Sequence, residues 1–383
     1  MLRTLIVIKF CGESQEYLPL LVIIKEKRII MSRLKKLRKR MLSEGIDAYY
    51  SMAPENRRYL SGFTGSTASL LILAQEAYLL TDFRYIEQAR QEAENFTVIN
   101  AGNEIFTALA QVSAGVKRLG FEGDYLNFLD YGRLRDALPQ TELVYLPQFI
   151  TDLRSRKDPT EISLLRRAVD IADQAWGHIS DSIRIGQKEE DIALDLEFTM
   201  RRAGASGASF DFIVASGKRS ALPHGRASSK LIQKGEFLTV DFGAVYQGYC
   251  SDITRTLVLG EPDERQKEIY EIVLAANQAV IDTLQPGLKG READAVARNL
   301  ICKAGYGEFF GHGLGHAVGL SVHEKPSLNQ SEETLLEPGM VVTVEPGIYI
   351  PDWGGVRIED MVMITEEGCE VLTNSPKSLK VIN

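Results

Sequence analysis

Cysteine is scarce in this sequence, and the cysteines that occur are far apart. Cys11, Cys250, Cys302 and Cys369 are the four, and no two of them form a Cys-x-x-Cys pair. Disulfide frameworks and thiolate zinc sites both use closely spaced cysteines. The pattern therefore argues against either arrangement and favours free thiols in a reducing compartment, so we expect a cytoplasmic protein.

Long apolar runs are also missing. No uninterrupted stretch reaches the roughly 18 to 20 residues that a membrane-spanning helix requires. A net charge of −8 argues against a nucleic-acid or anionic-membrane surface. The one basic cluster, residues 33–40, is interleaved with Leu34, Leu37 and Met41 at helical spacing, which predicts an amphipathic helix with a solvated basic face. We expect neither a nucleic-acid nor a membrane partner.

The first thirty residues are apolar but interrupted by charged side chains, and no small-residue cleavage site follows them. This pattern disfavours a signal peptide. Our hypothesis is that Met31 is the biological start and that residues 1–30 are an extension outside the native protein, because a helix-forming domain start follows Met31 directly. N-terminal sequencing of the native protein tests it, and a sequence beginning at Met1 would refute it.

A chain of 383 residues with 44% hydrophobic content is long enough for two soluble domains. In residues 31–155, short apolar strands alternate with helical patterns, which predicts an α/β domain. This region contains no histidine and no catalytic constellation. Its polar residues Asn56, Arg57 and Tyr59 are interpreted as surface or hinge residues.

A domain boundary is predicted where prolines and a charge run precede a helix start. Asp158 has the position of an N-cap, Pro159 follows at the first helical position, and Glu161 lies three residues after the cap. The second domain therefore spans residues 156–383. Helical patterns dominate its beginning, up to Arg202, and strand patterns follow.

The second domain contains an internal duplication. Residues 186–204 and 287–305 are helical patterns of equal length that begin and end with glycine. Further on, KGEFLTVDFGAVY at 234–246 matches PGMVVTVEPGIY at 338–349. Two matches in the same order, at an offset that grows from about 101 to about 104 residues, indicate two related halves.

The duplication aligns two acidic residues, Asp241 and Glu345, each at the end of an apolar strand after Thr-Val. A second acid, Asp252 or Glu359, follows each one beyond a hairpin turn signal. Such hairpins place the members of each pair directly across from each other or one diagonal away. A single pair could share a proton, but four converging carboxylates require cations to offset their repulsion.

Histidine occurs five times, and three of the five lie in the glycine-rich segment FFGHGLGHAVGLSVHE. The glycines disfavour a helix, and the glutamate of an HExxH motif is absent. We therefore expect an extended backbone with His312 and His316 on one face of a strand. His323 follows in the same segment and His224 lies on a Pro-Gly turn, whereas His178 is interpreted as a plain, partly buried helix residue.

The order Asp-x10-Asp, GHGLGH, EPGIY and VRIED resembles the M24 metallopeptidases of the pita-bread fold, in their aminopeptidase P and prolidase branch. The resemblance covers residues 31–383. It implies an α/β fold in two domains: a creatinase-like N-terminal α/β domain and a C-terminal pita-bread catalytic domain of duplicated α+β halves.

The resemblance also implies roles for individual residues. The five metal ligands of the family correspond to Asp241, Asp252, His316, Glu345 and Glu359. Its catalytic residues correspond to His224, His312, His323, Glu345 and Arg357, and its substrate contacts to His224, His323 and Tyr349. The implied cofactors are two divalent metal ions per subunit, with Mn²⁺ as the first expectation and Co²⁺ or Zn²⁺ as alternatives. Hard oxygen ligands with a single imidazole favour Mn²⁺ or a neighbouring divalent metal over a thiolate-type zinc site.

The implied activity is hydrolysis of the bond between an N-terminal residue and a following proline by a homodimeric Xaa-Pro aminopeptidase, with an Xaa-Pro dipeptidase of the same family as the alternative. Methionine aminopeptidases share the ligands but usually lack the first domain, and creatinase-type enzymes share the domains but lack the metals. A non-catalytic peptide-binding module is a more distant alternative, and it is disfavoured because every ligand is present.

Overall fold

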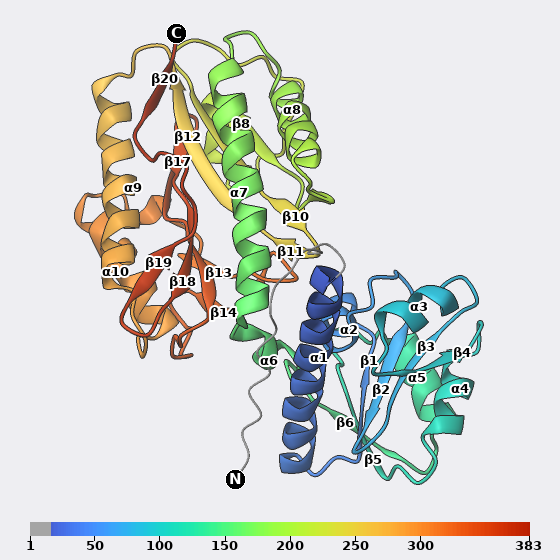
Figure 1. The fold of residues 1–383 in the computed structure, drawn as a ribbon. Helices are drawn as coiled ribbons and strands as arrows, with labels where there is room; N and C mark the ends of the chain where they lie inside the picture. The colour runs from blue at the N-terminus through green and yellow to red at the C-terminus, as the bar shows by residue number, and fades with distance from the viewer. Residues whose placement is uncertain (1–16) are drawn as a thin grey trace, which may run out of the picture. The chain divides into compact units, whose positions relative to one another are not determined.

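The computed structural model describes the backbone from residue 17 and the side chains from residue 28 to the C-terminus (Figure 1). The chain forms two compact units, one up to Leu153 and the other from Arg154 to Asn383. Residues 1–16, the first half of the proposed extension, lie outside the described residues. The first helix, α1, spans Tyr17–Ser43 and therefore begins before Met31 rather than at it.

The first unit is built on a mixed six-stranded sheet with the order β4-β3-β2-β1-β5-β6. Its strands are β1 (Ala48–Ser51), β2 (Ser69–Leu73), β3 (Ala77–Thr81), β4 (Thr97–Asn100), β5 (Arg118–Phe121) and β6 (Glu142–Tyr145). Its further helices are α2 (Pro54–Ser61), α3 (Ile86–Glu92), α4 (Ile105–Val112) and α5 (Phe128–Ala137), and the short α6 (Thr151–Ser155) contains the division between the units. The central β1-β2-β3 pairs are antiparallel and the outer pairs parallel, so the α/β prediction is confirmed.

The predicted amphipathic face of α1 is confirmed. Leu34, Leu37 and Met41 are buried, while most of the basic residues between them are exposed. The apolar spacing of three and four residues sets this orientation, because positions so spaced lie on one side of a helix.

The interpretation of Asn56, Arg57 and Tyr59 as surface or hinge residues is wrong. All three are buried in and around α2. Asn56 Nδ2 donates to Glu122 Oε2 at 2.6 Å, Arg57 Nη1 to the Ala68 carbonyl at 2.9 Å, and Tyr59 Oη to the Leu153 carbonyl at 3.0 Å. Polar side chains are tolerated inside when such partners satisfy them, and partners of this kind are not visible in a local sequence pattern.

In the second unit, one pair of helices lies on each side of the strands (Figure 1). The helices are α7 (Pro159–Ser182), α8 (Glu189–Arg202), α9 (Glu264–Thr283) and α10 (Gly290–Lys303), with short 3₁₀ segments at Gly217–Ala221 and Gly307–Phe309. One sheet has the order β20-β12-β9-β8 and a second the order β14-β13-β15-β18-β19. Smaller sheets join β11-β10-β7 and β16-β17.

The strands of the first half are β7 (Gly207–Ala208), β8 (Ile213–Ser216), β9 (Phe237–Phe242), β10 (Ala244–Tyr246), β11 (Tyr249–Cys250) and β12 (Ile253–Leu259). Those of the second half are β13 (Gly315–Ala317), β14 (Glu324–Leu328), β15 (Val341–Val344), β16 (Gly347–Ile350), β17 (Gly354–Arg357), β18 (Asp360–Ile364), β19 (Cys369–Val371) and β20 (Lys380–Ile382).

The structure confirms the internal duplication. Helices α8 and α10 both have 14 residues. Each is preceded by the same kind of isolated antiparallel bridge, Lys188 to Leu231 in one half and Lys289 to Leu335 in the other. The helix before each begins with a capping box, which confirms the predicted cap at Asp158.

Each half has its own apolar core. One core packs α7 and α8 against β9 and β12, through residues such as Leu238 and Val240. The other packs α9 and α10 against β15 and β18, through residues such as Val342 and Val344. The edges of these two cores carry the acidic residues, so packing of the halves decides where the carboxylates meet.

The three cysteines within the described part of the chain, Cys250, Cys302 and Cys369, are free thiols as predicted. Within the same part, none of the helices combines the length and apolarity that crossing a membrane requires.

The duplicated helices end on glycines in the left-handed region, Gly204 at φ 107° and Gly305 at φ 89°. A Cβ in that conformation costs roughly 1–2 kcal/mol, so we expect Gly204→Ala and Gly305→Ala each to lower the free energy of unfolding of the second unit by about that amount. Urea unfolding followed by tryptophan fluorescence measures this, because Trp176 and Trp353 both lie in the second unit.

The matched control is Gly177→Ala. Gly177 lies within α7, its φ is not positive, and nothing lies within 4 Å of an added Cβ. Alanine there should stabilise the unit by up to about 1 kcal/mol. Equal effects of the three substitutions would contradict the left-handed conformation assigned to Gly204 and Gly305 at the ends of their helices.

Candidate metal centre

The first hairpin brings two acids together as the sequence predicted. Asp241 on β9 pairs with Thr254 on β12, so Asp252, two residues before Thr254, lies one diagonal away on the same face. The chain turns at Gln247, which adopts a left-handed φ of 44°. The turn signal and the strand register together determine this first pair.

The second hairpin repeats the arrangement. Val344 pairs with Asp360 and Gly347 with Arg357, and this register sets Glu345 directly opposite Glu359. The chain turns at Asp352, again with a left-handed φ, of 60°. Each hairpin therefore contributes one acidic pair, and the predicted pairing is confirmed in both.

The two pairs converge at one place together with His316. Asp241, Asp252 and Glu359 are buried, and each offers an oxygen that lies within 4.8 Å of those of the other two. His316 Nε2 is 3.6 Å from Asp252 Oδ2 and 3.4 Å from Glu345 Oε1. Asp252 belongs to both groups, so the geometry describes two adjoining ligand sets that share one carboxylate.

Burial and mutual repulsion dominate the electrostatics of this cluster. Burial, followed by the charges of Glu359, Asp241 and Glu345, raises the pKa of Asp252 well above its ordinary value. Burial also raises the pKa of Glu345 to about 8 and that of Glu359 well above its usual range. Without a cation these side chains would hold protons rather than charge.

The residues present fit divalent cations. Asp241 Oδ1 is buried and has no hydrogen-bond partner within the described part of the chain, so one acceptor is left for a ligand. Burial, followed by the charge of His323, lowers the pKa of His316 to about 4. The imidazole is therefore neutral at neutral pH, as a metal ligand must be.

Arg357 is the buried cation beside the cluster. Its Nη2 donates to Asp241 Oδ2 at 2.6 Å, its Nη1 to Tyr349 Oη at 2.7 Å, and its Nε to Thr254 Oγ1 at 3.0 Å. The guanidinium thus orients one carboxylate of the first hairpin from the strand before Glu359. A planar fork of donors suits this task.

The glycine-rich segment is extended as expected around His316, but His312 is not on the same strand. His316 lies on β13, whereas His312 lies in irregular backbone before it. The prediction that both histidines share a strand face is therefore wrong. The reason is that Asp294 and Arg298 of α10 hold this segment: Asp294 Oδ1 accepts from the Leu314 amide at 3.1 Å, and Arg298 Nη2 donates to the His312 carbonyl at 2.8 Å.

The remaining histidines are placed as follows. His312 Nε2 is 2.9 Å from Tyr349 Oη, and burial lowers the pKa of His312 to about 4. His323 is exposed, and its ring centroid lies 4.3 Å from that of His316. His224 is exposed beside Pro223, whose carbonyl accepts from Arg357 Nη1 at 3.2 Å. His178 is exposed on α7, so the expectation of a partly buried side chain is wrong.

Two threonines that the sequence reasoning missed complete the site. Thr254 Oγ1 donates to Glu359 Oε2 at 2.7 Å, and Thr343 Oγ1 donates to Glu345 Oε1 at 3.2 Å. Thr343 Oγ1 also accepts from the His316 amide at 3.0 Å. The sequence does indicate these threonines, because each lies two residues from an acid along extended backbone and therefore on the same face as that acid.

Comparison with known proteins agrees with this geometry. Residues 163–366 match metallopeptidase family M24, and residues 33–156 match the creatinase/prolidase N-terminal domain. The chain belongs to metallopeptidase family M24. This M24 chain is 41% identical over 359 residues to an Xaa-Pro dipeptidase of Pyrococcus horikoshii, with 92% of this chain and 99% of the relative covered.

Solved structures are similar over the same length. An Xaa-Pro dipeptidase from Bacillus anthracis superposes with a TM-score of 0.90 at 46% identity, covering 92% of this M24 chain and 100% of that chain. An X-Pro aminopeptidase from Thermotoga maritima gives a TM-score of 0.86 at 39% identity, covering 91% and 99%. The family resemblance and the two-domain fold class are therefore confirmed, and the protein is a metallopeptidase.

If these side chains bind metal, adding Mn²⁺ to the chelator-stripped protein should stabilise the second unit. At about 100 times the dissociation constant, one bound ion adds about 2.7 kcal/mol to the free energy of unfolding. Urea unfolding with and without Mn²⁺ measures this gain. Asp252→Asn should lose most of it, because Asp252 contacts both ligand sets. Asp352→Asn is the control, since that acid is exposed at the tip of the second hairpin. An equal gain in the two variants would exclude this cluster as the site.

Proposed function

We propose that this M24 peptidase hydrolyses the peptide bond between an N-terminal residue and a following proline, and that it uses two divalent metal ions, preferably Mn²⁺. The observation that carries the proposal is the convergence of four carboxylates and the neutral imidazole of His316 in one site. Proline selectivity is supported by similar proteins that are described as Xaa-Pro dipeptidases and X-Pro aminopeptidases.

The proposed ligands are Asp241, Asp252, His316, Glu345 and Glu359. Two ions held there would lower the pKa of a water molecule and polarise the scissile carbonyl. Mn²⁺ is preferred because carboxylate oxygens are hard ligands and no thiolate is among them.

Glu345 is proposed to accept a proton from the attacking water and to pass it to the leaving proline nitrogen. Its side chain is partly exposed, whereas Asp241, Asp252 and Glu359 are buried. Thr343 holds one of its oxygens and thereby aims the carboxylate. A base in hydrogen-bond reach of both water and substrate is the general requirement for this role.

The exposed histidines are proposed to contact the substrate. His224 and His323 lie close enough that the charge of His224 helps burial to lower the pKa of His323. Both can donate to the developing oxyanion or to the proline end of a peptide. Tyr349 links His312 to Arg357 and lines the same site.

A homodimer in the cytoplasm completes the proposal. The family resemblance supports the dimer, and free, widely spaced cysteines support a reducing compartment. We expect light scattering to give twice the 42.6 kDa mass of one chain. A monomeric mass at assay concentration would contradict the dimer.

The length of the substrate distinguishes two forms of the activity. The aminopeptidase form predicts that the Mn²⁺-loaded enzyme releases the first residue from both an Xaa-Pro dipeptide and an Xaa-Pro-Xaa tripeptide. The dipeptidase form is favoured by the names of the relatives at 41% and 46% identity and predicts cleavage of the dipeptide alone. Mass spectrometry of the products separates the two.

Two controls complete this assay. An Xaa-Ala dipeptide should be cleaved much more slowly, and comparable rates would contradict proline selectivity. Glu345→Gln should lower kcat by about 10²–10⁴-fold, the usual contribution of a positioned base, while the protein stays folded. Glu308→Gln, which changes an exposed acid elsewhere in the unit, should leave kcat unchanged.

A further inference from the structure

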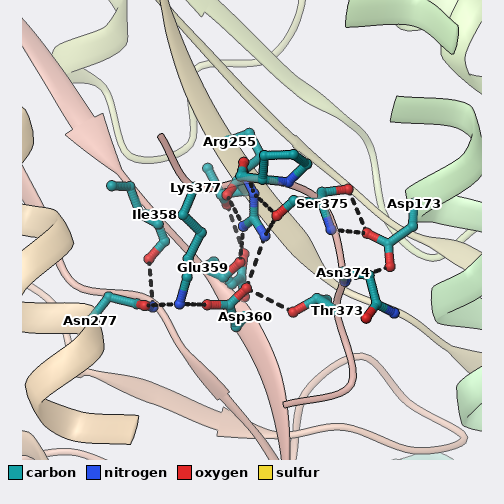
Figure 2. Close-up of polar contacts among 12 residues, drawn as sticks. Asp173, Arg255, Asn277, Ile358, Glu359, Asp360, Thr373, Asn374, Ser375 and Lys377 are labelled. Carbon is teal, nitrogen blue, oxygen red and sulfur yellow. Dashed lines mark hydrogen bonds and ion pairs between the residues drawn. The ribbon is translucent and has the colours of Figure 1, made fainter. Parts of the chain in front are cut away.

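A buried ionic network lies directly behind Glu359 and has no part in the proposed chemistry (Figure 2). Asp360 follows Glu359 in the chain, so its side chain points to the opposite face of the strand, away from the ligand cluster. Asp360 Oδ1 accepts from Arg255 Nη2 at 2.9 Å and from Thr373 Oγ1 at 2.7 Å. Its Oδ2 lies 2.8 Å from Lys377 Nζ.

Arg255 connects this network to the backbone of the ligand strands. Its Nη1 donates to the carbonyl of Glu359 and, at 2.9 Å, to that of Thr254. Thr254 is the residue whose hydroxyl donates to the Glu359 carboxylate, and its carbonyl also accepts from the Glu359 amide at 3.1 Å. One guanidinium, 2% exposed, therefore holds Glu359 and its hydroxyl donor together.

A segment near the C-terminus provides the remaining partners of Arg255 and Asp360. We call residues 373–377 the C-terminal brace. Arg255 Nη2 donates to the Ser375 carbonyl at 2.7 Å. Asp173 on α7 accepts from the amides of Asn374 at 2.7 Å and Ser375 at 2.9 Å (Figure 2). The brace is thus tied to a helix as well as to Arg255, and it gives the guanidinium a fixed acceptor.

The same network reaches the second ligand strand through α9. Asn277 Nδ2 donates to the carbonyl of Val344 at 3.0 Å and lies 3.4 Å from that of Ile358. These residues immediately precede Glu345 and Glu359. Asn277 Oδ1 accepts from Lys377 Nζ at 2.8 Å, so the brace also supports the backbone before both acids.

Stability alone is a poor explanation for this arrangement. Buried ion pairs are costly to desolvate, and apolar residues of similar volume are often as stabilising. Arg255 instead joins the Glu359 carbonyl to the carbonyls of Thr254 and the brace, and Asn277 donates to the carbonyls just before Glu345 and Glu359. A metal centre needs its ligand backbone held in place, because groups that orient the ligands set the affinity for the metal. Arg255 and Lys377 also add two positive charges against the one negative charge of Asp360.

We propose that Arg255 and Asp360 are positioning residues of the metal centre, which act with the C-terminal brace to fix the backbone of Glu359. This inference rests on the proposed metal-dependent function. Groups that orient metal ligands typically change metal affinity by 10- to 100-fold when they are altered. We therefore expect Arg255 and Asp360 to influence metal binding although neither side chain contacts the metal.

The test uses stripped full-length protein and Mn²⁺ as the probe, titrated by calorimetry. Arg255→Lys keeps the charge but loses the planar fork that serves four carbonyls, those of Thr254, Glu359, Ser375 and Pro376. Asp360→Asn keeps an acceptor for Thr373 but removes the negative charge. Each should weaken binding of at least one Mn²⁺ by about 10- to 100-fold and shift the visible absorption of the Co²⁺-loaded protein. Arg166→Lys is the matched control, because Arg166 forms a partly exposed ion pair with Glu370 in the same unit.

Circular dichroism of the metal-free proteins shows which variants are folded. If either central variant does not fold, Asp173→Asn takes its place, because this change loosens the brace from a partly buried position without touching Glu359. Folded variants with wild-type Mn²⁺ affinity and a wild-type Co²⁺ spectrum would overturn the inference and leave the proposed function intact. A wild-type protein that binds no Mn²⁺ would overturn both.

Discussion

The repulsion among four converging carboxylates is the constraint on which the rest of the catalytic unit depends. Asp241, Asp252 and Glu359 are buried and Glu345 is mostly so, and the raised pKa values of Asp252, Glu345 and Glu359 express the cost of charging these groups together. Arg357 offsets part of this charge from within the cluster. Divalent cations held there, as proposed, would offset the remainder.

The duplicated architecture builds the cluster from two similar hairpins, each of which provides one acidic pair. A two-stranded hairpin can bring two acids together by register alone, but further ligands must come from another part of the chain that packs against it. Two related halves, each with its own helix pair and core, present their hairpins to a common place. His316 then enters from β13, which pairs with β15 beside Glu345.

Local rules explain which predictions held. The hairpin pairs followed from turn signals and strand alternation, and the helix start at Asp158 followed from its capping box. The predictions for His312 and for Asn56, Arg57 and Tyr59 failed for one shared reason. Their surroundings are set by partners outside the local pattern, such as the Ala68 carbonyl for Arg57 and Glu122 for Asn56, and no local periodicity reports such partners.

The acidic residues that pair, and the repeat that makes the pairs equivalent, were determined by the sequence alone, because register and turn chemistry act over about ten residues. The meeting of the four carboxylates with His316 was decided by the tertiary structure, since it requires the two halves to pack. The same holds for the network behind Glu359. Arg255 reaches Asp360 and Ser375 across more than one hundred residues of chain, and only packing of the two halves brings these groups within hydrogen-bond distance.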